Sequence, residues 1–140
     1  MWLYNNIPVL EIDEKYISFV YLITNLTNNK RYVGKKTTKF LKRKKIKGKK
    51  KTKKILVDSD WREYYGSSNS LLKDIELFGK ENFKREILVF CLSKGTASYI
   101  EAKLQFSMEV LENPDLFYND QIRCRIHRSH IKIEKDPKNE

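Results

Sequence analysis

The sequence contains two cysteines, no long apolar run, and no acidic residue between Glu14 and Asp58. A membrane-spanning helix needs about 20 consecutive apolar residues, so we expect none here. Cys91 and Cys124 are too few for a disulfide scaffold and fit a reduced, cytoplasmic protein. The first residues lack a basic start followed by an apolar segment, so we expect no signal peptide and no secretion. The length fits a single domain over residues 1–140, with a polar tail at about 135–140.

Basic charge is concentrated in one segment. The net charge is +11, yet outside residues 35–54 the chain holds 16 basic and 18 acidic side chains. Such a block repels itself and does not pack into a core, so we interpret residues 35–57 as an insertion. It is either a solvated segment or an arm that grips phosphates, and the concentration of charge favours the arm. The thirteen basic residues are Lys35, Lys36, Lys39, Lys42, Arg43, Lys44, Lys45, Lys47, Lys49, Lys50, Lys51, Lys53 and Lys54.

The remaining pattern predicts a small α+β sandwich, with helices packed against a short mixed sheet. Ser68 or Ser70 can cap the first helix, whose apolar stripe is Leu71, Leu72, Ile75 and Phe78. Thr96 can cap the second helix, whose stripe is Ile100, Leu104, Met108 and Leu111, and which Asn113-Pro114 ends. The expected elements are strands at 7–10, 16–23, 30–34, 83–90 and 121–127, and helices at 70–78 and from 96.

Two tyrosines, Tyr21 and Tyr32, lie on either side of the predicted turn Asn28-Asn29. With a two-residue turn, Tyr32 lies opposite Asn25, and Asn25 shares a face with Tyr21 because strand side chains alternate. Both phenol groups then lie on one surface of the sheet. A three-residue loop would place them on opposite faces, so the prediction depends on register.

These segments resemble the GIY-YIG nuclease family. Phe19-Val20-Tyr21 stands where the family has Gly-Ile-Tyr, and Tyr32-Val33-Gly34 stands where it has Tyr-Ile-Gly. The lysine-rich insertion and Trp61-x-x-Tyr64-x-Gly66-Ser67-Ser68 are similar to a phage-associated branch of free-standing homing endonucleases. The resemblance extends over about residues 17–126. It implies a central three-stranded antiparallel sheet flanked by helices.

The resemblance also implies roles for particular residues. Glu101 corresponds to the family's metal-binding glutamate, and a carboxylate suits Mg²⁺ or Mn²⁺. Tyr21 would accept a proton from the attacking water or position it, with Lys35 and Lys36 lowering its pKa. Tyr32 would orient the water or a phosphate oxygen, and Lys35 would stabilise charge on the phosphate. Asn119 corresponds to the family's late asparagine, which assists the substrate or the metal shell.

Two family residues have no clear counterpart. Spacing puts the arginine at Lys42 or Arg43, inside the insertion. Arg62 and Arg85 are the alternatives, and we prefer Arg62 because Trp61 can hold it. Lys36 or Tyr65 would replace the missing histidine. The residues expected to contact nucleic acid are Lys36, Lys42, Arg43, Lys44, Lys45, Ser68, Arg123 and Arg125.

The sequence therefore predicts a metal-dependent, homing-endonuclease-like DNA endonuclease that acts on double-stranded DNA in the cytoplasm, of the host if phage-encoded, as a monomer or homodimer. An alternative is a catalytically impaired module that only binds nucleic acid, and a third is a basic RNA-binding protein. Cys124-x-x-His127-x-x-His130 offers three zinc ligands. The strand pattern, however, buries Cys124 and turns His127 outward, which argues against zinc.

Overall fold

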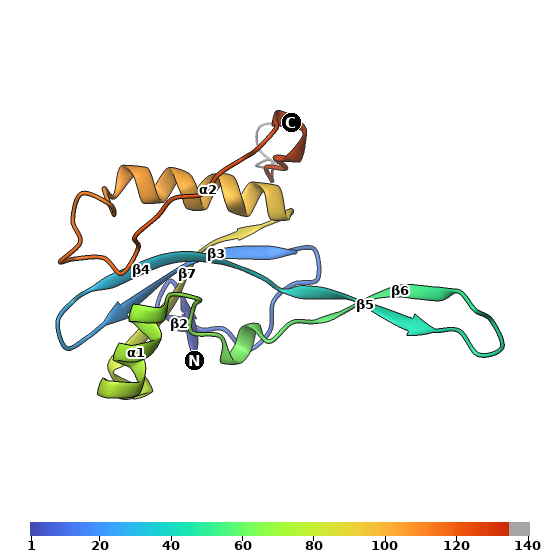
Figure 1. Cartoon of the computed structure of the whole chain (residues 1–140), viewed down its shortest axis with the longest axis horizontal. Helices are drawn as coiled ribbons and strands as arrows, with labels where there is room; N and C mark the ends of the chain where they lie inside the picture. The colour runs from blue at the N-terminus through green and yellow to red at the C-terminus, as the bar shows by residue number, and fades with distance from the viewer. Residues whose placement is uncertain (135–140) are drawn as a thin grey trace.

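The structure is a computed structural model that describes residues 1–134. A five-stranded sheet of order β2-β1-β7-β3-β4 forms its centre, with α2 against one face and α1 near the other (Figure 1). A separate two-stranded sheet, β5-β6, projects from the end of β4. The strands are β1 (Trp2–Tyr4), β2 (Ile7–Pro8), β3 (Ser18–Asn25), β4 (Arg31–Thr37), β5 (Lys39–Lys45), β6 (Thr52–Asp58) and β7 (Phe83–Cys91); the helices are α1 (Asn69–Phe78) and α2 (Lys94–Ser107).

The predicted three-stranded antiparallel centre is confirmed. β3 pairs antiparallel with both β4 and β7, and β1 adds a parallel pair to β7, which makes the sheet mixed. The predicted strand at 7–10 is present as the short edge strand β2, whereas β1 with its buried Trp2 was not expected. A register shift between Val20 and Tyr21 places a bulge in the β3-β7 ladder beside Tyr21.

The two tyrosines do lie on the same face of the sheet. In the observed register Tyr32 pairs with Ile23, and Tyr21 pairs with Gly34. The loop is longer than the predicted two-residue turn, because the Asn25 N–H bonds to the Lys30 carbonyl and residues 26–29 lie outside the ladder. The loop still holds an even number of residues, so the alternation of side chains places both rings as predicted.

The sheet separates two apolar cores. Tyr21, Trp61, Leu71 and Ile75 pack on the α1 face, while Val20, Val33 and Ala97 pack on the α2 face. Within residues 1–134, no helix is both long and apolar enough to cross a membrane.

The helix boundaries agree with the sequence for α1 and differ for α2. Ser68 caps α1 as predicted, by accepting a hydrogen bond from the Leu71 N–H at 3.4 Å. Ser93, and not Thr96, caps α2, which ends at Ser107 well before Asn113-Pro114. The predicted stripes were wrong at Leu72 and Leu111, which are 40% and 44% exposed. Each lies at the margin of an otherwise correct stripe, where periodicity alone cannot separate core from surface.

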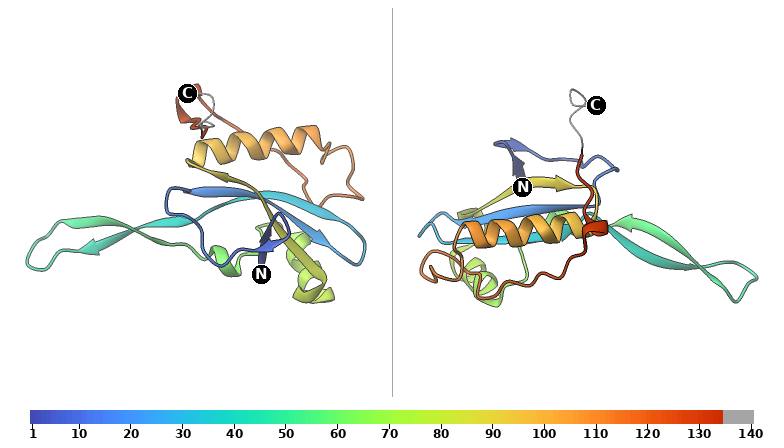
Figure 2. Two further views of the ribbon diagram at one scale, coloured as in Figure 1. Left: turned by 180° about the vertical axis from the view of Figure 1, so that it is seen from behind. Right: turned by 90° about the horizontal axis from the view of Figure 1, so that it is seen from above.

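The basic insertion folds as a projecting hairpin, which we call the arm (residues 39–58). Figure 2 shows it reaching away from the sheet when seen from behind and from above. The predicted boundary at residue 35 was wrong, because Lys35–Thr37 complete β4. Side chains pair across the arm from Lys39 with Asp58 at its base to Lys45 with Thr52 near its tip.

The predicted strand at 121–127 is absent. Residues 121–127 have no strand assignment; Ile122 and Ile126 are half-buried, and Cys124 is exposed. A period-two pattern identifies one sheltered side, but a strand also needs a backbone partner. The edge of β4 is instead met by residues 116–119, through a bridge between Arg31 and Phe117. The polar tail predicted at 135–140 lies outside the described residues.

Candidate active site

Gly34 allows the Tyr21 ring to cross the edge strand β4. A Cβ atom on Gly34 would lie 2.3 Å from the Tyr21 Oη and 2.4 Å from its Cζ. Real Cβ atoms do not approach other heavy atoms this closely, so only glycine fits. Tyr21 is 1% exposed, and its hydroxyl therefore lies over the backbone of β4.

Tyr21 belongs to a cluster of three tyrosines. The ring centroid of Tyr21 lies 6.2 Å from that of Tyr32 and 6.0 Å from that of Tyr64. Gly66 packs on the cluster with φ +92°; a Cβ there would lie 3.4 Å from Tyr32 and 3.5 Å from the Tyr21 Oη. The segment that follows Trp61 thus packs against both tyrosines at Gly66, where a positive φ and the close approach both favour glycine.

The predicted pKa of Tyr21 was wrong in direction. Burial raises the pKa of Tyr21 well above its ordinary value, and the neighbouring Tyr32 and Tyr64 raise it further. Burial also raises the pKa of Tyr32. Lys35 and Lys36 do not lower the pKa of Tyr21 as predicted, because desolvation of a phenolate outweighs nearby cations. Both phenols are therefore neutral donors at neutral pH.

The helix α2 presents three polar residues to β4. The Lys35 ammonium donates a hydrogen bond to the Ser98 hydroxyl, and the Gln105 Nε2 donates to the Val33 carbonyl at 3.1 Å. Glu101 lies on α2 three residues after Ser98 and four before Gln105, and therefore on the helix face that makes these two contacts with β4. Its negative charge raises the pKa of both Tyr21 and Tyr32, so the carboxylate lies within electrostatic range of both phenols.

The Glu101 carboxylate is partly desolvated. Burial raises its pKa, and the charge of Lys35 opposes that rise. We find no hydrogen bond or ion pair to this carboxylate within residues 1–134. A hard anionic oxygen in this setting gains from a cation, so Glu101 fits a Mg²⁺ or Mn²⁺ ligand. The described residues include no group of three His, Cys, Asp or Glu side chains, so such an ion would take its other ligands from water and substrate.

Asn119 holds the outer edge of β4. Its Oδ1 accepts from the Val33 N–H at 3.0 Å, and its Nδ2 donates to the Val33 carbonyl at 2.8 Å. The Asn119 side chain thus satisfies the two backbone groups of Val33, the residue before Gly34, as a neighbouring strand would. The other predicted role of Asn119, toward substrate or metal, stays a prediction.

Replacing Asn119 with leucine should lower the free energy of unfolding by about 2 to 3 kcal/mol, because the buried Val33 N–H would lose its partner. Urea unfolding measures this loss. Asn113→Leu is the control, since the side chain of half-buried Asn113 makes a single hydrogen bond, to the carbonyl of the exposed Glu109. Equal losses in the two variants would contradict the proposed clamp.

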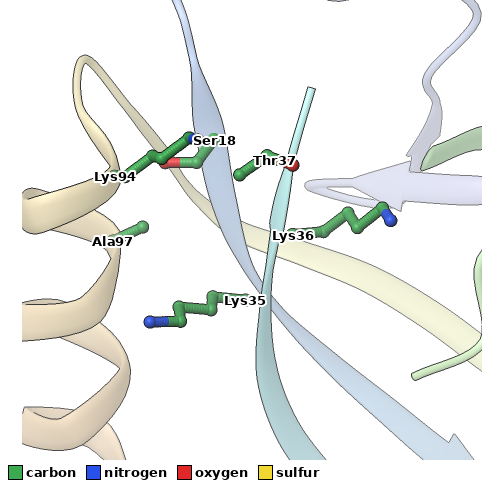
Figure 3. A pocket seen from close by; sticks show the side chains of 6 residues that line it. All are labelled: Ser18, Lys35, Lys36, Thr37, Lys94 and Ala97. Atoms are coloured by element: carbon green, nitrogen blue, oxygen red, sulfur yellow. The ribbon is translucent and has the colours of Figure 1, made fainter. Parts of the chain in front are cut away.

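Lys35 and Lys36 leave β4 in opposite directions (Figure 3). Lys35 points toward α2 and lines a recess of about 240 Å³ together with Ser18, Lys94 and Ala97. Lys36 points to the tyrosine face, where its ammonium lies 4.0 Å from the Tyr64 ring centroid and 2.5 Å from Asp60 Oδ1. Cations therefore flank β4 on both faces.

We call Tyr21, Tyr32, Lys35 and Glu101 the β4 site. The two tyrosines lie on one face of the sheet at β4, and Lys35 points to the other face, toward the helix α2 that carries Glu101. A polar recess of about 410 Å³ opens beside Tyr32, lined in part by Ser67, Lys73 and Asp120. The Tyr32 and Ser67 hydroxyl oxygens lie 3.4 Å apart. Two phenols, a carboxylate and an ammonium thus lie around β4 near the buried Gly34.

A family model described as "Putative endonuclease segE, GIY-YIG domain" matches residues 2–122. The chain belongs to the GIY-YIG family. Searches of curated proteins and of solved structures found no match. Membership of this nuclease family supports nucleic acid as the substrate class.

Arg62 and Arg85, two of the candidates for the GIY-YIG arginine, both contact other residues. Arg62 stacks on Trp61 and pairs with Glu11 at 3.0 Å and Asp58 at 3.6 Å. Arg85 is 4% exposed and donates to the carbonyls of Arg62 and Tyr64. Both arginines therefore have structural partners, and the structure does not bring either to the β4 site.

The remaining predicted residues are dispersed. Ser68 is used as the cap of α1, and Tyr65, the proposed replacement for the histidine, stacks on Arg85 at 4.1 Å. Arg123 and Arg125 are exposed on the unpaired segment 121–127. The exposed cations Lys42, Arg43, Lys44 and Lys45 lie on β5, in the arm.

The structure gives no support to a zinc site at Cys124, His127 and His130. The prediction that Cys124 is buried was wrong, since Cys124 is exposed. The two histidines instead close a short turn, because His127 Nδ1 accepts from the Ser129 N–H and His130 Nδ1 accepts from the His127 N–H.

Sequence reasoning missed three residues around the GIY-YIG triplets. Tyr64 completes the tyrosine cluster, Ser98 holds Lys35, and Gln105 contacts β4 from α2. The Gln105 Oε1 is buried and has no hydrogen-bond partner in the described part of the chain. The one signal in the sequence was the spacing of Ser98, Glu101 and Gln105, which places the three residues on one face of a helix.

Proposed function

We propose that this protein is a metal-dependent DNA endonuclease that hydrolyses phosphodiester bonds. The observation that carries the proposal is the convergence at Gly34, where Tyr21 and Tyr32 come from one face and Lys35 and Glu101 come from the other. A scissile phosphate bound beside β4 would lie near the exposed Lys35 and the partly buried Glu101 and Tyr32, with the buried Tyr21 hydroxyl behind them. The charge of the neighbouring arm supports a polyanionic substrate.

In this proposal Glu101 holds Mg²⁺ or Mn²⁺ together with waters and a phosphate oxygen. When bound, such an ion would supply charge stabilisation at the leaving oxygen. Lys35 adds a second positive charge, because Ser98 fixes its ammonium on the Glu101 side of β4. The metal ion and Lys35 would together supply positive charge where negative charge develops during hydrolysis.

The tyrosines act as neutral hydrogen-bonding groups. Because their pKa values are raised, Tyr21 and Tyr32 keep their protons at neutral pH. Tyr21 therefore positions the attacking water rather than serving as a phenolate base. Tyr32, beside the polar recess, orients a water or a phosphate oxygen.

The preferred substrate in this proposal is double-stranded DNA, and the enzyme is homing-endonuclease-like, acts in the cytoplasm, and is a monomer or homodimer. A catalytically impaired DNA- or RNA-binding module is the second candidate. It is favoured by one observation, which is that both Arg62 and Arg85 are committed to other contacts. The two candidates differ in cleavage, not in affinity or salt dependence.

Supercoiled plasmid incubated with Mg²⁺ separates these candidates. We expect the wild type to convert the plasmid to nicked or linear forms, and a chelator to stop the reaction. Tight, salt-sensitive binding without cleavage, on varied DNA and with Mn²⁺ as well, would favour the binding module.

A further inference from the structure

We propose that the arm is a β-ribbon that enters the major groove of a DNA duplex bound at the β4 site. This proposal rests on the proposed function for its substrate, but its geometry comes from the arm alone. The outer arm, residues 42–54, is exposed except for half-buried Ile46. It carries ten basic and no acidic side chains: Lys42, Arg43, Lys44, Lys45, Lys47, Lys49, Lys50, Lys51, Lys53 and Lys54.

Like charges face each other across the arm. Arg43 pairs directly with Lys54, and Lys44 pairs directly with Lys53. Directly opposed like charges destabilise an antiparallel pair. The acids that contact the hairpin, Asp58 and Asp60, lie at its base, where they pair with Lys39 and Lys36. A polyanion bound around the outer arm would reduce this repulsion, so binding of a polyanion should stabilise the hairpin.

Both faces of the arm are cationic. Opposed residues share a face, so Lys42, Lys44 and Lys53 lie on one face, and Arg43, Lys45 and Lys54 lie on the other. A ribbon lying flat along one phosphate backbone would need cations on a single face. Cations on both faces match a ribbon between two rows of phosphates, as in a groove.

The dimensions select the major groove of DNA. A two-stranded ribbon fits the major groove, which is about 12 Å wide, but not the minor groove, which is about 6 Å wide. The major groove of A-form RNA is too narrow for side chains to read. Leu41 and Leu56 form an exposed pair, each 63% exposed, on the Arg43 face. The thymine methyl groups in the DNA major groove offer apolar partners for such a pair.

The arm and the β4 site can occupy one duplex. β5 begins two residues after β4 ends, with only Thr38 between them. Figures 1 and 2 show the arm extending outward from the end of β4. At about 3.4 Å per residue, the path from Gly34 to Lys45 spans at most about 37 Å, which is close to one turn of B-DNA. The arm would thus contact the groove within one turn of the scissile phosphate.

The test is binding to a DNA duplex without divalent metal, measured by fluorescence anisotropy across salt concentrations. The arm variant combines Arg43→Gln, Lys44→Gln, Lys53→Gln and Lys54→Gln. The control removes the same charge elsewhere, as Lys80→Gln, Lys84→Gln, Lys103→Gln and Lys132→Gln. We expect the slope of log K against log salt to become shallower by about 3 to 4 in the arm variant alone. Equal slopes for the arm variant and the wild type would overturn the proposal.

Groove probes give a second measurement. Bulky substituents on thymine C5 fill the major groove and should weaken wild-type binding by about tenfold or more, with little effect on the arm variant. Netropsin, which fills the minor groove, should not compete. Competition by netropsin, or equal affinity for duplex RNA, would overturn groove entry. These measurements need no cleavage, so an inactive protein that passes them would refute the proposed nuclease and leave the arm proposal standing.

Discussion

Replacing Glu101 with glutamine should abolish plasmid cleavage by this protein, with a loss of about 100-fold or more in rate. Removing a metal ligand costs several kcal/mol of transition-state stabilisation, and each 1.4 kcal/mol or so is a factor of ten. Glutamine keeps the size of the side chain and its place on α2, so the loss would report the charge. Glu76→Gln removes an exposed carboxylate from α1 and should leave cleavage unchanged.

The same variant should be more stable than the wild type at neutral pH. Burial raises the pKa of Glu101 in the folded chain, so its ionised form is disfavoured by folding. The wild type loses stability as pH rises through that raised pKa, and glutamine avoids this loss. The variant should therefore unfold at a higher urea concentration than the wild type at neutral pH. The difference in stability should vanish in acid, where Glu101 is protonated. If Glu101→Gln cleaved plasmid as fast as the wild type and was equally stable, Glu101 would not belong to the site.

Local chemistry made most of the fold predictable. The β-branched and aromatic residues of 16–23 predicted β3, and the continuous apolar run within 83–90 predicted β7. The apolar stripe with its Ser68 cap predicted α1 almost to the residue. The shared face of Tyr21 and Tyr32 depends only on whether the loop holds an even number of residues, so it survived an error in loop length. These features are determined by a few adjacent residues, and for that reason they can be predicted from a single sequence.

The errors arose where distant segments compete. Residues 121–127 alternate like a strand, but β4 finds its edge partners in Phe117, Tyr118 and the Asn119 side chain instead. The pKa of Tyr21 depends on how Trp2, Trp61 and Tyr64 close around it, and each of these residues is far from Tyr21 in sequence. The arm was recognised by charge, but its hairpin depends on cross-strand pairs such as Phe40 with Val57 at its base. No local pattern reports such burial or pairing.

Gly34→Ala should destabilise the protein by about 3 kcal/mol or more, the largest effect that we expect from adding one methyl group. The new Cβ would overlap the Tyr21 Oη and Cζ, and that ring is 1% exposed and enclosed by Trp2 and Tyr64. Overpacking of a buried contact costs about 1–3 kcal/mol, and a rigid ring beside a strand backbone leaves little room to relax. Thermal and urea unfolding measure the loss.

A double-mutant cycle identifies the cause of this loss. Tyr21→Leu removes the ring, so Gly34→Ala should cost far less in that background, with a coupling of about 1–3 kcal/mol. Gly48→Ala serves as a control, because a Cβ there meets nothing within 4 Å and the cost should be limited to about 1 kcal/mol for its φ of +79°. If Gly34→Ala cost the same with and without the ring, the clash would not be the cause. Glycine would then be required for another reason, and the Tyr21 hydroxyl would not need to cross β4 to reach the site.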